Sequence, residues 1–161
     1  MSAEQEFILG EFRRALDERN RVAIPKSLAD LLTVESSDCI LAKERPGCIS
    51  LWAAQVWQTR LKEEVSLIEH KMRAGRLRDE IAQVQLLGRL LSTRHENVPL
   101  DDRGRLLVPE GFREFLGVER GSEVMVVGAA VCVEIWSPAA WLKYLQGRMP
   151  KFRRLLSKLS K

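Results

Sequence analysis

The chain has 161 residues, which is enough for one compact domain with its own hydrophobic core. Hydrophobic residues make up 45% and charged residues 30%, as in soluble globular proteins, and no apolar run approaches the roughly 18 residues of a membrane span. The net charge of +4 is unevenly distributed: without the six basic residues between Arg148 and Lys161, 20 basic and 22 acidic residues remain. Binding to a polyanion must therefore come from local basic clusters.

The cysteines and the start of the chain predict the cellular compartment. Cys39, Cys48 and Cys132 are odd in number and lie in apolar, strand-like stretches, so we expect reduced core thiols and no disulfide framework. The first six residues are polar and acidic, unlike a signal peptide. These features predict a cytoplasmic protein.

The first third of the chain predicts short strands with one helix between them. Pro25 ends strand pairing and suits the first turn of a helix. Pro46 and Gly47 favour a hairpin turn. The expected elements are a strand at Phe7–Leu16, a strand–turn–strand at Leu16–Ile24, a helix at Lys26–Leu32, a polar turn at Thr33–Asp38, and strands at Cys39–Lys43 and Cys48–Trp52 joined by a turn at residues 44–47.

The middle of the chain predicts a helical hairpin. Apolar residues recur at helical spacing in two stripes, with Gly75 between them. The stripes are Trp57, Leu61, Val65, Ile68 and Met72, then Leu77, Ile81, Val84, Leu87 and Leu91. We expect them to pack on the sheet or on a neighbouring subunit, because the polar faces mix acids and bases, unlike helices that lie on membranes.

The last third predicts the plan of the first third again. Pro109 opens a helix, Gly117 is well placed to end it, and Ser137 with Pro138 forms a helix start. The expected elements are a strand–turn–strand at Leu100–Val108, a helix at Glu110–Leu116, and strands at Glu123–Val127 and Val131–Trp136 around a turn at residues 128–130. The basic tail from Arg148 has three open interpretations: a disordered end, a segment with non-specific affinity for DNA, or a contact with an anionic membrane or a partner.

The first and last thirds form an internal repeat with an offset of 84 residues. Residues 17–25 and 101–109 share the pattern Asp-x-Arg-x-Arg, three apolar residues and proline. The register continues without a gap through Leu16/Leu100, Leu32/Leu116, Val34/Val118, Glu35/Glu119, Cys48/Cys132, Trp52/Trp136 and Trp57/Trp141. A repeat of about 42 residues is too small to fold alone, so the two copies are expected to complete one core.

The Asp-x-Arg-x-Arg segments predict two equivalent tight turns. Asn20 and Gly104 lie between the two arginines of each segment, and both residue types tolerate the left-handed backbone of tight hairpins. Asp17 and Asp101 are placed to accept hydrogen bonds from turn amides and to pair with the arginines four residues on. We therefore expect these four residues to orient the turns.

Arginine is concentrated at these turns. One interpretation is that the arginines only brace the turns through the aspartates. However, exposed arginine on a rigid turn also binds phosphate as a fork or reads guanine edges in a groove. The candidate DNA-binding residues are Arg19, Arg21, Arg103 and Arg105 in the turns, with Arg13 and Arg14 just upstream.

These features resemble the MraZ family of bacterial transcriptional regulators, which is built from SpoVT/AbrB-type repeats. The resemblance covers about residues 7–146 and rests on the paired turns, the apolar-proline steps after them, and the hairpins ending at Trp52 and Trp136. It implies an α+β fold, a pseudo-two-fold swapped-hairpin β-barrel from two tandem AbrB-like repeats with a helical hairpin insert and short flanking helices. The implied segments are a first repeat at 7–57, the insert at 58–97, a second repeat at 98–146 and a basic tail at 147–161, in one compact domain.

The resemblance also implies a function. Members of the family bind direct repeats in double-stranded DNA near their own operon as ring-shaped homo-oligomers, and they regulate division and cell-wall genes. The chain would then act in the cytoplasm, on the nucleoid, with no cofactor, metal or small-molecule substrate. By position, Arg21 and Arg105 inherit the DNA contact, with Arg19 and Arg103 beside them.

Two departures from the family leave an alternative open. This chain has Asn20 where glycine is usual, and its first helix lacks the arginine that the second repeat has at Arg113. The first turn is therefore expected to be the more divergent DNA reader. The alternative function is an architectural or antitoxin-like DNA binder of the wider AbrB superfamily with different target genes, but the doubled repeat and the helical insert favour the MraZ interpretation.

Catalysis has little support in the sequence. His70 and His95 are isolated, and His95 lacks the second histidine of a zinc-protease helix. No Cys-x-x-Cys, phosphate loop or Gly-x-Ser-x-Gly sequence occurs. Asp101 and Asp102 are followed by arginines, which argues against a metal site there. We expect no enzymatic activity.

Overall fold

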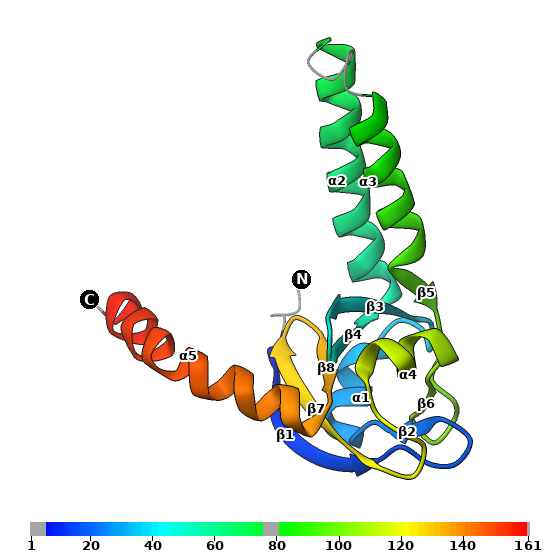
Figure 1. Ribbon diagram of the computed structural model, residues 1–161, viewed down its shortest axis with the longest axis vertical. Helices are drawn as coiled ribbons and strands as arrows, with labels where there is room; N and C mark the ends of the chain where they lie inside the picture. Colours follow the sequence, from blue (N-terminus) through cyan, green and yellow to red (C-terminus); the bar gives the residue numbers. More distant parts are fainter. Residues whose placement is uncertain (1–5, 76–80, 161) are drawn as a thin grey trace.

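The computed structural model describes residues 6–75 and 81–160, and its centre is one antiparallel sheet (Figure 1). Six strands pair in the order β1-β7-β8-β4-β3-β5, and a separate two-stranded ribbon joins β2 and β6. The strands are β1 (Ile8–Ala15), β2 (Arg21–Ala23), β3 (Cys39–Arg45), β4 (Cys48–Ala53), β5 (His95–Asn97), β6 (Arg105–Leu107), β7 (Glu123–Ala130) and β8 (Val133–Trp136). The predicted α+β class is confirmed. In the described part of the chain, β1 and β5 are the two edges of the larger sheet.

Strands of the two repeats pair with each other in both sheets. In the larger sheet β1 of the first repeat pairs with β7 of the second, and β4 of the first pairs with β8 of the second. In two places the paired residues are equivalent under the 84-residue offset: Val22 pairs with Leu106, and Ser50 pairs with Glu134. Because a local two-fold axis pairs equivalent residues in this way, both pairs lie on pseudo-two-fold axes.

One hydrophobic core serves both repeats. It lies between the larger sheet, the β2–β6 ribbon, α1 (Lys26–Leu32) and α4 (Glu110–Leu116). Its buried side chains include Leu28 and Leu32 of α1, Phe112 and Leu116 of α4, Val22 and Leu106 of the ribbon, and Ile49 and Ile135 of the sheet. The three cysteines are buried free thiols, and burial raises the pKa of Cys39 to about 11. A second, smaller cluster of Cys48, Met125, Val127 and Trp136 also combines both repeats, so neither cluster in the described residues belongs to one repeat alone.

The short helices begin and end where local signals predicted. α1 and α4 have the predicted bounds, and each follows a proline. Gly117 ends α4 in the left-handed conformation, with φ of 77°. α5 (Pro138–Leu159) begins after Ser137, whose hydroxyl accepts a hydrogen bond of 3.3 Å from an amide of the first turn.

The turn of the second hairpin was predicted too early. The sequence predicts a turn at residues 128–130, but β7 continues through Ala130 and the chain reverses between β7 and β8. The reason is a close contact with β1: a Cβ on Gly128 would lie 2.5 Å from the carbonyl oxygen of Ile8. Gly128 therefore serves the close approach of two strands. In the first hairpin, β3 runs to Arg45, so the turn is shorter than predicted.

The insert forms the predicted helical hairpin and projects away from the sheet (Figure 1). α2 (Ala54–Arg73) and α3 (Ile81–Thr93) lie side by side, and only their base meets the sheet, where the Trp57 and Trp52 ring centroids are 5.8 Å apart. Leu77 of the predicted second stripe lies outside the described residues. Beyond the base the stripes do not pack on the sheet, and their residues Met72, Ile81 and Leu87 are exposed. Packing on a neighbouring subunit stays a prediction.

The basic tail is helical. α5 continues across residue 147, the boundary that the sequence suggested for the tail, and ends at Leu159. The interpretation as a disordered end therefore does not hold for residues 148–159. Among the helices within residues 6–75 and 81–160, none is long and apolar enough to span a membrane.

Candidate nucleic-acid interface

One carboxylate holds the first turn. Asp17 Oδ1 accepts hydrogen bonds of 2.8 Å from the amides of Arg19 and Arg21, and Asp17 Oδ2 accepts one of 3.1 Å from Arg21 Nε. The amide of Asn20 donates to the Asp17 carbonyl at 3.0 Å, and Asn20 has a left-handed φ of 62°. Asp17 thus fixes both the backbone of the turn and the direction of the Arg21 side chain.

The second turn repeats this geometry. Asp101 Oδ1 accepts hydrogen bonds of 2.9 Å from the amides of Arg103 and Arg105, and Asp101 Oδ2 accepts one of 2.8 Å from Arg105 Nε. The amide of Gly104 donates to the Asp101 carbonyl at 2.9 Å, and Gly104 has a φ of 72°. The backbone conformation predicted for Asn20 and Gly104 is therefore present in both turns.

The hydrogen bonds stabilise the ionised form of both aspartates. The backbone amide of Arg21 is the main cause that lowers the pKa of Asp17 below its ordinary value of 3.8, and the Arg21 guanidinium adds to it. The amide of Arg105 lowers the pKa of Asp101 in the same way. Because a carboxylate with a lowered pKa contributes stability only while it is ionised, this contribution is present above about pH 4 and is lost as the pH falls further.

Both turns should therefore make the protein sensitive to acid. We expect the variant Asp17→Asn/Asp101→Asn to melt at a lower temperature than the wild type at pH 7, because the amides lose a charged acceptor. Between pH 5 and about pH 2 its melting temperature should fall less than that of the wild type. Thermal unfolding followed by circular dichroism across this pH range measures both effects. Asp102→Asn is the matched control, since Asp102 accepts none of these hydrogen bonds, and parallel curves for all three proteins would contradict the assignment.

The β2–β6 ribbon connects the two turns and has one buried face and one exposed face. Val22 and Leu106 at its centre are fully buried, so their neighbours along each strand point outward. Arg21 pairs with Leu107, which is 56% exposed. We call the outer surface the ribbon face; it consists of Arg21, Ala23, Arg105 and Leu107. Standard strand spacings put the Cα atoms of its two arginines about 8 Å apart.

The arginine side chains of the ribbon face are held by aspartates but remain partly exposed. Their side chains are 28% exposed at Arg21 and 31% exposed at Arg105. In each of them the aspartate binds Nε, so the terminal Nη1 and Nη2 groups are left as a free fork in the described part of the chain. A planar fork of two donors matches the O6 and N7 atoms of guanine or two oxygens of a phosphate.

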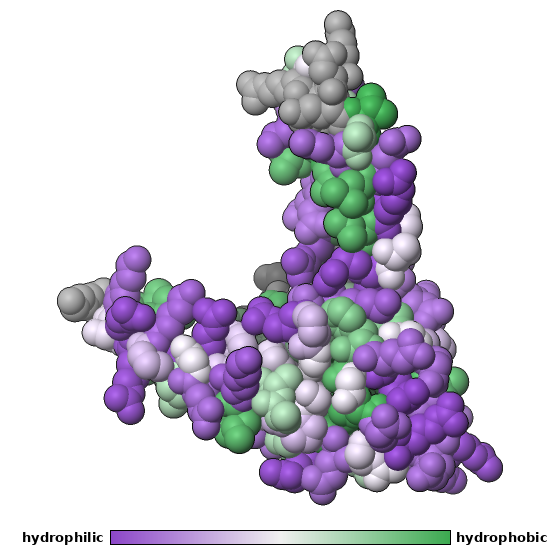
Figure 2. Space-filling view, in the orientation of Figure 1, coloured by the Kyte–Doolittle hydropathy of each residue, from purple (hydrophilic) through white to green (hydrophobic). Residues whose placement is uncertain are grey.

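Arg19 and Arg103 occupy the tips of the turns. Both side chains are exposed, and their guanidinium groups bond to no other side chain among residues 6–75 and 81–160. Figure 2 shows a continuous hydrophilic surface at this corner of the molecule, below the base of the hairpin. Exposed cations beside the ribbon face suit contact with a phosphate backbone.

Arg13 and Arg14 lie on β1 of the larger sheet, outside the ribbon face. Arg13 forms an ion pair of 2.8 Å with Glu123 on β7. Arg14 stacks over the ring of Phe12, with 5.4 Å between its Cζ atom and the ring centroid. Arg13 and Arg14 therefore have partners of their own on the larger sheet and are not part of the ribbon face.

The two turns differ in their contact with the short helices. Asn20 Nδ2 donates to Glu110 Oε2 of α4 at 3.2 Å, and Glu110 also bonds Arg113 and Arg120. The guanidinium of Arg113 lowers the pKa of Glu110 to about 2. Sequence reasoning missed Glu110, and the only signal for it was that Asn20 and Arg113 both break the repeat.

At the second turn a small residue takes the place of this network. A Cβ on Gly104 would lie 3.6 Å from the Cβ of Ala29, the residue of α1 that is equivalent to Arg113. At the second turn Gly104 thus faces Ala29. At the first turn Asn20 bonds Glu110, which in turn bonds Arg113. The first turn is therefore tied to the second repeat by a side-chain hydrogen bond, and among residues 6–75 and 81–160 no equivalent bond joins the second turn to the first repeat.

The chain is similar in sequence to proteins of one family. The family model for the MraZ protein, described as antitoxin-like, matches residues 92–155. The chain is 28% identical over 151 residues to the transcriptional regulator MraZ of Syntrophomonas wolfei, covering 94% of this chain and 95% of that protein. It is 30% identical over 145 residues to the transcriptional regulator MraZ of Kocuria rhizophila, covering 89% and 90% of the two chains.

Proposed function

Because the chain belongs to the MraZ family of transcriptional regulators, we propose that it binds specific sequences of double-stranded DNA through the ribbon face. In this proposal Arg21 and Arg105 read bases, and Arg19 and Arg103 bind the flanking phosphates. The protein acts on the nucleoid in the cytoplasm and controls its own operon together with division and cell-wall genes. Arg13 is already paired with Glu123, so in this proposal it contributes at most to the electrostatic potential around the ribbon face.

The observation that supports this proposal most is the way the two arginines are held. An arginine that must find its orientation on binding loses side-chain entropy, whereas one fixed by an aspartate has lost it beforehand. Here both arginines are fixed through Nε and present their other edge outward. An arginine that only braced a turn would have no need to keep its terminal fork free and partly exposed.

We also propose that the protein works as a ring-shaped homo-oligomer on repeated promoter boxes. The body of the chain is close to neutral, so one subunit offers few phosphate contacts and should bind weakly. Several subunits on successive boxes raise the effective concentration and recover affinity without any new contact. The paired register around the pseudo-two-fold axes also favours a swapped-hairpin barrel, in which the β2–β6 ribbon covers the open side of the larger sheet.

The test is binding to the DNA upstream of the protein's own gene. Fluorescence anisotropy at fixed salt should show affinity at least about 10³-fold tighter for this DNA than for a scrambled sequence. A fragment cut down to one box should bind about 10²-fold or more weakly than the full fragment. Equal affinity for upstream and scrambled DNA would instead support the architectural or antitoxin-like alternative.

A further inference from the structure

The distal half of α5 has an apolar face that the described part of the chain does not cover. The first half is anchored, because Trp141 and Tyr144 pack on Trp136 with ring centroids 5.2 and 4.9 Å away. Beyond this anchor the helix leaves the sheet (Figure 1). Its exposed residues Met149, Phe152, Leu155, Leu156 and Leu159 share one side at 3.6 residues per turn. A face of this size on a rigid helix indicates a partner.

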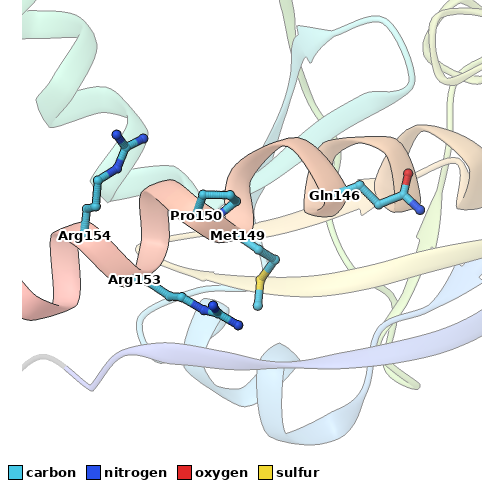
Figure 3. A pocket seen from close by; sticks show the side chains of 5 residues that line it. All are labelled: Gln146, Met149, Pro150, Arg153 and Arg154. Atoms are coloured by element: carbon cyan, nitrogen blue, oxygen red, sulfur yellow. The ribbon is translucent and has the colours of Figure 1, made fainter.

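The charges on this helix are all of one sign. From Ser137 to Ser160 the chain has no acidic residue, and its basic residues are Lys143, Arg148, Lys151, Arg153, Arg154 and Lys158. Figure 3 shows Arg153 on the same side of α5 as Met149, whereas Arg154 points to the opposite side. Arg153 therefore flanks the apolar face, and Arg154 does not.

The same chain has a groove with the complementary character. It has a volume of about 480 Å³ and lies between the end of α1, the start of α2, the start of β1 and the β7–β8 turn. Its apolar lining includes Leu31, Val34 and Val131, of which Val34 is 75% exposed. Its only charged lining residues in the described chain are Glu6 and Glu35. An apolar groove with an acidic rim fits an apolar helix with basic flanks.

We propose that the distal half of α5 docks in this groove on a second copy of the chain, with Arg153 beside the acidic rim. The inference rests on the proposed homo-oligomer and names its contact. α5 is anchored at Trp141 and leads away from the body, so its end meets a neighbour. Helix and groove are different surfaces of the chain, as a head-to-tail contact requires, and such a contact forms a ring when the rotation between neighbouring subunits closes.

The experiment measures the mass of the full-length protein by light scattering after size exclusion, without DNA. Arg153→Glu is expected to shift the protein to smaller species, and Leu156→Ser, on the same face, should do the same. Arg154→Glu introduces the same charge change on the far side and should leave the mass unchanged. Combining Arg153→Glu with Glu35→Arg should restore the wild-type mass, because the charges across the contact are exchanged.

Other outcomes would overturn the docking model. Wild-type mass in Arg153→Glu and Leu156→Ser, equal loss in Arg154→Glu, or no recovery in the combined variant would each exclude it. A loss of affinity for DNA or for phosphatidylglycerol vesicles in Arg153→Glu at unchanged mass would assign the helix to those partners instead. Binding to upstream DNA is measured separately, by anisotropy. The DNA-binding proposal can therefore fail while the helix contact holds, and the helix contact can fail while the DNA-binding proposal holds.

Discussion

Replacing Arg105 with alanine is expected to weaken binding to the upstream DNA by about 5- to 150-fold, or about 1–3 kcal/mol, because the fork then no longer reads a base. Arg21→Ala should have an effect of the same kind. The two residues lie at opposite ends of the ribbon face and are held by the equivalent hydrogen bonds that they donate to Asp17 and Asp101. Anisotropy titrations with upstream and scrambled DNA at the same salt concentration measure both effects.

The difference between the two DNA sequences separates base contacts from phosphate contacts. If Arg105 reads a base, its removal weakens binding to the upstream DNA far more than to the scrambled DNA, whereas removal of a phosphate-binding arginine weakens both equally. Arg105→Lys sharpens the distinction, since lysine keeps the charge but has neither the Nε bond to Asp101 nor the planar fork. We expect the lysine variant to bind scrambled DNA like the wild type and upstream DNA like the alanine variant.

Arg13→Ala is the matched control for these titrations. Arg13 is also an exposed arginine, but it lies on β1 and pairs with Glu123 away from the ribbon face. Its replacement should leave the ratio of the two affinities unchanged. If Arg13→Ala weakens binding as much as Arg21→Ala and Arg105→Ala, general positive charge explains the binding, and if neither ribbon arginine matters, DNA binds elsewhere.

The two short helices were predicted from the sequence with their correct bounds because their start and stop signals are local. α1 and α4 follow prolines that fix the backbone at a helix start, and Gly117 permits the left-handed end of α4. The hydrogen bonds of the turns are also local, because Asp17 and Asp101 bind amides two and four residues on. An interaction between residues within five positions of each other can be predicted from the local sequence pattern. The role of the ribbon arginines on DNA stays a prediction.

Interactions between distant segments could not be predicted in the same way. The bond from Asn20 to Glu110 spans 90 residues and depends on how the repeats interleave. Gly128 was predicted to be a turn residue because glycine is common in turns, but the fold places it where two strands approach closely. The offset of 84 residues showed which positions are equivalent, but not that equivalent residues pair, as Val22 and Leu106 do.

Gly128→Ala should be one of the most destabilising single-methyl changes in the protein. Gly128 pairs with Gly10, and a Cβ on Gly128 would lie 2.5 Å from the Ile8 carbonyl oxygen and 2.7 Å from the Leu9 Cα. These are backbone atoms of β1, so relief of the clash requires β1 to move away from β7. We expect a loss of roughly 3 kcal/mol in the free energy of unfolding, at the upper end of the usual cost of overpacking.

Urea unfolding followed by tryptophan fluorescence measures this loss as a lower midpoint. Gly88→Ala makes the same chemical change in α3, where a new Cβ would meet no atom within 4 Å. Alanine is favoured over glycine inside a helix, so this control should be neutral or gain up to about 1 kcal/mol. If both variants unfold at the wild-type midpoint, β1 does not pack on β7 as closely as described. The two repeats, which the β1–β7 pairing interleaves, would then pair in a different register. The placement of Arg21 and Arg105 on one face would also have to be revised.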